Sequence, residues 1–460
     1  MWTMKRMPAA RQWRDAVLLL LLIAALGITG CSGGDGGDHA QQSQAVSENS
    51  AAARDESGDR EAAGGDRGST NTGEPAKGPL DDRAPEPGAG TGETPPDEGS
   101  DPEPQAGMLT AGEWQDTNRW GNWLAQLNGD AGGRSQQLWS FHRFDRLVVE
   151  VTADGSPVAD AAVTVKDDSG GIVWEARTDI HGRAYAYAEL FSPDRNERDY
   201  DVAVASGAGV RRFGNVPIPR EKPLELELGR AKPLPDSVDI LFAVDTTGSM
   251  QDELDYLEAE LSDVFERVRG GLQEKLKIRI GTDFYRDLHD EYVVRTFPFT
   301  EDVALAVDHL AAQTAKGGYD YPEAVDEALD KALDEERWSE DARARLLFLV
   351  LDAPPRDDKA TVRRMHELVR RAAAMGVRIV PVASSGVNDD AEYLLRFLAV
   401  STGGTYVFLS DHSGVGKDHK EADVGEYEVR ALNDLLVDII RRYSTAPQAD
   451  MAGAADSGSE

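Results

Sequence analysis

The residues best suited to chemistry follow one short apolar run, residues 240–244. Asp245 ends this run, Thr247 and Ser249 follow at alternate positions, and apolar residues at helical spacing occupy 250–268. The run predicts a strand buried on both faces of a parallel sheet, and the later spacing predicts an amphipathic helix. Ligands bind outside the carboxyl ends of strands in open α/β sheets. A carboxylate and two hydroxyls at that place offer hard oxygen ligands to a small divalent cation.

A regular alternation of strands and helices must position these side chains. Apolar strand patterns recur at 277–284, 292–297, 345–351, 377–382 and 405–408, and helical patterns at 301–313, 321–336, 359–375, 389–400 and 427–442. This alternation predicts an α/β fold, an open doubly wound sheet of the Rossmann-like kind. Asp352 ends the strand at 345–351, so we expect it at the same edge of the sheet as Asp245.

The segment 236–445 resembles a von Willebrand factor A (VWA) domain. Asp245, Thr247 and Ser249 match the Asp-x-Ser/Thr-x-Ser element of that family's metal ion-dependent adhesion site (MIDAS), and Asp352 matches its distal aspartate. The resemblance implies that both hydroxyls bind the metal directly, that both aspartates act largely through water, and that one coordination position stays open for a partner's carboxylate. Mg²⁺ is the first candidate because it keeps water ligands, with Mn²⁺ or Ca²⁺ as alternatives.

The resemblance also implies a third site position in the loop after the second helix. We expect Asp320 there, with Thr314 as the alternative. Ala353 and Pro354 replace the usual glycine after the distal aspartate, so we expect that loop to have a different shape while the carboxylate is kept. A simpler interpretation without metal is that Ser249 caps the helix and Asp245 supports a turn.

Enzymatic interpretations fit the sequence poorly, so we expect no catalytic residues and no small-molecule substrate. A haloacid dehalogenase-type phosphatase needs a second acid where Thr247 stands, and no glycine-rich phosphate loop followed by lysine is present. The turn at Asp245 is not a nucleophile elbow. His412 and His419 lie in a long polar loop, 410–425, where histidines are more often solvated than ligating. That loop would leave from the edge of the site if the preceding strand is parallel to the first.

The N-terminus predicts a lipid anchor. Basic residues precede an apolar stretch at 16–26, and Ile28-Thr29-Gly30-Cys31 resembles the lipobox of bacterial lipoproteins, with Cys31 the only cysteine. We therefore expect a lipoprotein signal peptide at 1–30 and lipidation of Cys31, with an ordinary signal peptide or an uncleaved anchor as alternatives. Ser32 resembles the pattern of lipoproteins sent to the outer membrane of Gram-negative bacteria. The net charge of −34 argues against nucleic-acid partners and against polybasic membrane binding.

Three further segments complete the predicted organisation. Residues 31–107 are acidic and rich in Gly, Pro and Ser, which predicts a disordered tether. We also expect residues 446–460 to form a disordered tail. Residues 108–142 predict a tryptophan-rich helical segment that docks on the next domain, with a carbohydrate platform as the alternative. Residues 143–230 contain six short strand patterns, predict a β-sandwich, and resemble carboxypeptidase regulatory-like or Ig-like modules.

Together these features predict a surface-anchored lipoprotein that binds a protein or extracellular-matrix partner through a metal on its VWA domain. The membrane would be contacted through the lipid alone. The alternative is an assembly scaffold of the cell envelope whose VWA domain works without metal.

Overall fold

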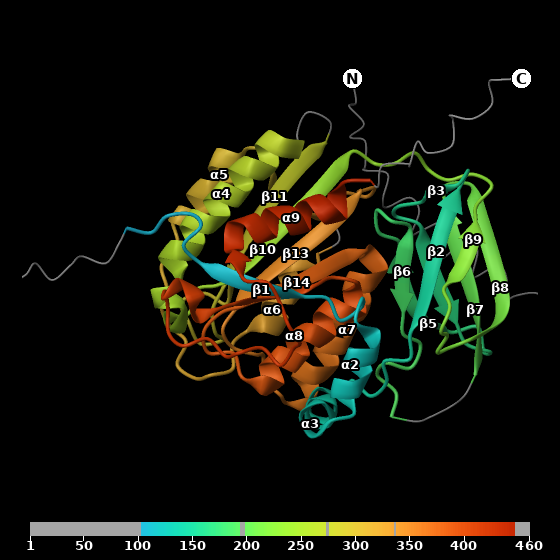
Figure 1. The fold of residues 1–460 in the computed structure, drawn as a ribbon, viewed down its shortest axis with the longest axis horizontal. Helices are drawn as coiled ribbons and strands as arrows, with labels where there is room; N and C mark the ends of the chain where they lie inside the picture. The colour runs from blue at the N-terminus through green and yellow to red at the C-terminus, as the bar shows by residue number, and fades with distance from the viewer. Residues whose placement is uncertain (1–102, 194–197, 273–275, 335–336, 447–460) are drawn as a thin grey trace, which may run out of the picture. The chain divides into compact units, whose positions relative to one another are not determined.

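The computed structural model describes residues 103–446 except 194–197, 273–275 and 335–336 (Figure 1). The predicted signal peptide, Cys31, most of the tether and nearly all of the tail lie outside the described residues. No described helix is both long enough and apolar enough to cross a membrane. The central element is one eight-stranded sheet, which confirms the predicted α/β fold. Its strands, in spatial order, are β12 (Val294–Thr300), β11 (Lys277–Tyr285), β10 (Ser237–Asp245), β13 (Ala344–Leu351), β14 (Val377–Ala383), β15 (Tyr406–Leu409), β1 (Thr110–Trp114) and β16 (Arg430–Ala431).

Five neighbouring strands of this sheet are parallel: β11, β10, β13, β14 and β15. Helices cover both faces of the sheet (Figure 1). Successive side chains of β10 point to opposite faces: Ile240 and Phe242 belong to one buried cluster, and Leu241 and Ala243 to the other. The first cluster includes helices α4 (Leu254–Leu272), α5 (Val303–Ala311) and α9 (Leu432–Ser444). The second includes α6 (Val325–Ala332), α7 (Lys359–Met375) and α8 (Asp389–Thr402). The near-continuous apolar strands follow from this two-sided burial.

The sheet contains a strand from far upstream in the chain. β1 lies antiparallel between β15 and β16, with Ala111 opposite Leu409. A Cβ at Gly112 would lie 2.6 Å from the ring of Phe408, so only glycine fits this register. The predicted domain start at 236 therefore omits a strand, and the segment predicted as helical from 108 begins with that strand.

The rest of the tryptophan-rich segment forms helices α2 (Trp120–Leu127) and α3 (Asp130–Trp139), which pack on α8. Trp123 is wholly buried, with its ring 5.7 Å from that of Phe397, and the indole N–H of Trp139 donates to the carbonyl of Asp390. Their burial contradicts the alternative of an exposed carbohydrate platform at these two residues.

An arginine at the centre of this contact holds the two segments together. Arg396 is fully buried and donates to both carboxylate oxygens of Asp116 at 2.8 and 2.9 Å. It also donates to the side chain of Gln126 and to the carbonyl of Asp423. Asp116 is therefore the counter-charge of a buried cation.

The segment between α3 and β10 forms two four-stranded sheets. One contains β2 (Leu147–Ala153), β3 (Ser156–Pro157), β6 (Arg183–Ala186) and β9 (Leu224–Glu227), and the other β4 (Ala162–Lys166), β5 (Ile172–Arg177), β7 (Asp199–Ser206) and β8 (Gly209–Pro217). β8 was not among the predicted strands because its side chains are mostly exposed and show no apolar alternation. The resemblance of this segment to known modules stays a prediction.

We expect Arg396→Ala to lower the free energy of unfolding by about 3–5 kcal/mol, because it leaves the buried Asp116 carboxylate without a cation, with only the indole N–H of Trp114 still donating to it. Urea unfolding of the full chain, followed by tryptophan fluorescence, measures this loss. The exposed Arg363 on α7 provides the control, since Arg363→Ala should change stability by no more than about 0.5 kcal/mol. Equal effects of both substitutions would contradict the role assigned to Arg396.

Candidate functional site

The turn after β10 is organised by the carboxylate of Asp245. Its Oδ1 accepts hydrogen bonds from the backbone N–H of Thr247 at 2.8 Å and from the Thr247 hydroxyl at 2.7 Å. The Thr247 hydroxyl lies 3.1 Å from that of Ser249. Asp245 and Thr247 are buried, whereas Ser249 is exposed, so the site opens to solvent at the serine. The structure therefore brings together the three residues of the predicted element.

Asp352 follows β13, next to β10, and is 4% exposed. Burial raises the pKa of Asp245, and the nearby charge of Asp352 raises it further. Burial also raises the pKa of Asp352, and the charge of Glu253 adds to this effect. The carboxylate of Asp352 therefore disfavours the ionisation of Asp245, and that of Glu253 disfavours the ionisation of Asp352.

Glu323 is the acidic residue that the loop before α6 brings to this cluster. Its side chain is 3% exposed, and its backbone N–H donates to the carbonyl of Pro354 at 3.0 Å. Burial and the charge of Asp245 raise the pKa of Glu323 to about 9. A Cβ at Gly318 would lie 2.8 Å from both Glu323 Oε1 and Thr247 Cβ, so this glycine lets the loop pass between the two side chains.

The two residues predicted for the third position, Asp320 and Thr314, are both exposed. The side chain of Asp320 is 56% exposed and pairs with Arg356 at 3.4 Å. Thr314 is exposed, and its carbonyl accepts a hydrogen bond from Arg286 at 2.8 Å. Sequence reasoning missed Glu323 because an acid at the start of a predicted helix is explained by the helix dipole alone.

The cluster fits a divalent cation on the chemistry of its donors. Asp245 Oδ2, Glu323 Oε2 and Asp352 Oδ1 are buried and have no hydrogen-bond donor among the described residues. Buried acceptors without a donor are costly unless a proton or a cation reaches them. Within the described residues, His, Cys, Asp and Glu side chains alone form no group of three that would hold a metal. The hydroxyls of Thr247 and Ser249 offer two further oxygen donors beside Asp245.

The loop after β15 leaves from the same edge of the sheet, because β15 is parallel to β14. His419 fixes this loop to the site: its Nδ1 lies 2.9 Å from Asp411 Oδ1, and its Nε2 lies 3.1 Å from Glu253 Oε1. Glu253 follows closely after Ser249 in the chain and accepts a hydrogen bond from the backbone of Ser385 at 3.1 Å. His419 is thus buried between two acids rather than solvated as predicted.

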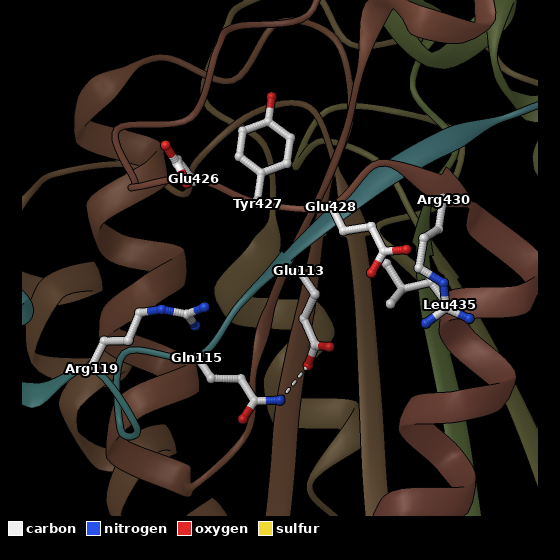
Figure 2. A pocket seen from close by; sticks show the side chains of 8 residues that line it. All are labelled: Glu113, Gln115, Arg119, Glu426, Tyr427, Glu428, Arg430 and Leu435. Atoms are coloured by element: carbon white, nitrogen blue, oxygen red, sulfur yellow. Dashed lines mark hydrogen bonds between the residues drawn. The ribbon is translucent and has the colours of Figure 1, made fainter.

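A separate hollow of about 470 Å³ lies beside β1, β16 and α9 (Figure 2). Its lining is mostly charged or polar: Glu113, Gln115, Arg119, Glu426, Tyr427, Glu428, Arg430 and Leu435. Figure 2 shows the hydrogen bond from Gln115 to Glu113, at 2.9 Å. Glu113 also pairs with Arg442, and Arg430 pairs with Asp438. None of the predicted metal ligands lines this hollow.

We expect the loop at His419 to loosen as the pH rises. Burial lowers the pKa of His419, but the contacts with Glu253 and Asp411 outweigh it and leave the pKa above its usual 6.5. The pKa values of Glu253 and Asp411 are lowered, so both partners stay ionised. The stabilisation is therefore complete below pH 6.5 and is lost as the pH rises through the raised pKa.

Hydrogen exchange of residues 411–423, corrected for intrinsic rates, measures this loosening. His419→Gln should exchange about 5- to 30-fold faster at neutral pH and lose the pH-dependent step. The exposed His412 is the control, and His412→Gln should behave as the wild type. A pH step that survives in His419→Gln would assign it to another group.

The match to one protein family supports the fold. Residues 239–417 match the von Willebrand factor type A domain family. No curated protein matches the chain. The solved structures similar to this chain include the conserved hypothetical protein BatB from Bacteroides thetaiotaomicron, at 16% identity and a TM-score of 0.30, with 45% of this chain and 98% of that chain covered. They also include the pilus adhesin SpaC from Lactobacillus rhamnosus GG, in its open conformation, at 12% identity and a TM-score of 0.33. That match covers 54% of this chain and 33% of the SpaC chain. Residues 239–417, which include Asp245, Thr247, Ser249, Glu323 and Asp352, are thus a von Willebrand factor type A domain.

Proposed function

We propose that this protein binds a protein or extracellular-matrix partner through a divalent cation held at the carboxyl-end edge of its VWA domain. The observation that carries the proposal is the set of three buried carboxylates, each with one oxygen that lacks a donor among the described residues. The VWA match supports a role in protein interaction. We propose a binding protein rather than an enzyme.

Five residues would hold the cation: Asp245, Thr247, Ser249, Glu323 and Asp352. A bound Mg²⁺, Mn²⁺ or Ca²⁺ would supply an electrophilic centre that accepts a carboxylate oxygen from the partner. Oδ1 of Asp245 orients the Thr247 hydroxyl and so leaves Oδ2 available to the cation or its water. The exposure of Ser249 leaves a path for the partner to approach.

The charge of the buried carboxyl groups also supports a bound cation. Without a cation, the raised pKa of Glu323, about 9, means that a proton neutralises it at neutral pH. A divalent cation would replace such protons, because carboxylates bind metals in their ionised form.

Substitution of Glu323 should reveal the proposed metal site. Glu323→Gln keeps the size of the side chain but removes its charge, so we expect Mn²⁺ or Mg²⁺ affinity to fall by about 10- to 100-fold. Asp320→Asn is the matched control and should leave affinity within about twofold, because Asp320 faces solvent beside Arg356. Isothermal titration calorimetry measures both. The reverse order of effects would restore Asp320 as the third ligand.

The combined variant Asp245→Ala, Ser249→Ala tests the site as a whole and separates metal-dependent binding from a metal-independent scaffold. It should abolish metal binding and, with it, capture of the partner from envelope extract in Mg²⁺. A metal-independent scaffold would instead capture the same partner from extract in Mg²⁺, in chelator and with this variant.

We also propose that the chain is anchored by lipid at Cys31, in the outer membrane or at the surface of a Gram-negative cell. The lipobox-like sequence that ends at Cys31 supports this proposal. Two or three acyl chains give stable attachment without a membrane-spanning helix.

Cys31→Ser should block this modification and leave an uncleaved precursor or a released form. Labelled fatty acid and membrane fractionation measure the outcome. Wild-type protein that incorporates no label would end the anchoring proposal.

A further inference from the structure

Exposed apolar side chains gather on two loops beside the candidate site. Eight large apolar side chains are exposed in the described part of the chain. Three of them lie on the loops that follow β11 and α5: Leu288 at 41%, Tyr319 at 85% and Tyr321 at 44% exposure. Single exposed apolar residues are ordinary on protein surfaces, but a group of them beside a site is a feature of interaction surfaces.

Backbone contacts place one of these loops directly against the proposed metal ligands. The N–H of Gly248, between Thr247 and Ser249, donates to the carbonyl of Gly317 at 3.0 Å. Gly318 then passes so close to Thr247 that a Cβ would not fit. Tyr319 is the next residue, so its exposed ring is carried at the rim of the site.

The two loops are braced against each other and against a third. Oδ2 of Asp290 accepts hydrogen bonds from the N–H of Asp287 at 3.1 Å and from that of Gly318 at 3.0 Å. The hydroxyl of Tyr321 donates to the carbonyl of Gly386 at 3.0 Å, in the loop after β14. The apolar side chains are therefore presented on a preorganised frame, which lowers the ordering cost of binding.

We propose that Leu288, Tyr319 and Tyr321, which together form an apolar rim, bind an aromatic or aliphatic side chain next to the carboxylate that the partner gives to the metal. The partner would then be a protein segment in which an acidic residue is flanked by an apolar one. This proposal rests on the proposed function and adds the chemistry of the partner.

The choice of occupant follows from charge and from side-chain chemistry. The buried acids call for a cation, and a cation with an open position calls for an anionic partner group. Lys417, exposed on the loop after β15, adds positive charge near Asp352. Tyrosine contributes a large contact area and is enriched where binding energy concentrates. A partner that offered only a carboxylate would make no contact with the apolar rim.

Two small carboxylates separate binding to the metal from binding to the apolar rim. Propionate offers the carboxylate alone, and 3-phenylpropionate adds an aromatic ring. With the full chain and Mg²⁺, saturation-transfer NMR should show 3-phenylpropionate binding about 3- to 10-fold more tightly than propionate. Leu288→Ser combined with Tyr319→Ser should remove this preference and leave propionate binding unchanged. Leu305→Ser, at a 43% exposed residue on α5, is the control and should keep the preference.

The outcomes distinguish the two proposals. Propionate binding that depends on Mg²⁺, without a preference for the phenyl compound, overturns the apolar rim and leaves the metal site standing. A preference that persists in the combined rim variant also overturns the rim. Absence of Mg²⁺-dependent carboxylate binding overturns the proposed function, and the rim with it.

Discussion

Acidic groups held away from water beside one another are the constraint on which this VWA domain depends. Asp245 and Asp352 end neighbouring parallel strands, and Glu323 reaches them from a loop. Each group is costly to ionise in this place, and their mutual repulsion adds to the cost. Two local features accompany these acids: Gly318 lets a loop pass close to Thr247, and the backbone N–H and hydroxyl of Thr247 both donate to one oxygen of Asp245.

The strands that carry the site could be predicted because they are buried on both sides. A run such as 345–351, short, apolar and followed by prolines, favours a central strand, and the acid that follows such a strand lies at the carboxyl edge of the sheet. The pattern also predicts the bounds of α7 over 359–375. These successes depend on local signals that are strong in a single sequence.

The failures depend on contacts between distant segments. Glu323 lies close to Thr247 because Gly318 packs between them, some seventy residues after Thr247 in the chain, and nothing near Glu323 in the sequence reveals this. β1 is short and ordinary in composition, and its place between β15 and β16 follows from pairing with residues about 300 positions away. Asp116 has the residue type of a helix cap, and only the fold shows that it forms a buried ion pair with Arg396.

The position of β1 has a consequence for how the domain is oriented. Because β1 runs antiparallel to β15, its first residues pair with the carboxyl end of β15, and the carbonyl of Thr110 accepts a hydrogen bond from Ser410. Just before the strand, the N–H groups of Gly107 and Leu109 donate to the buried carboxylate of Glu260 on α4. The preceding chain thus reaches the sheet on the side where Asp245 and Asp352 lie. The candidate site and the point where the chain enters the sheet therefore share one edge of this domain.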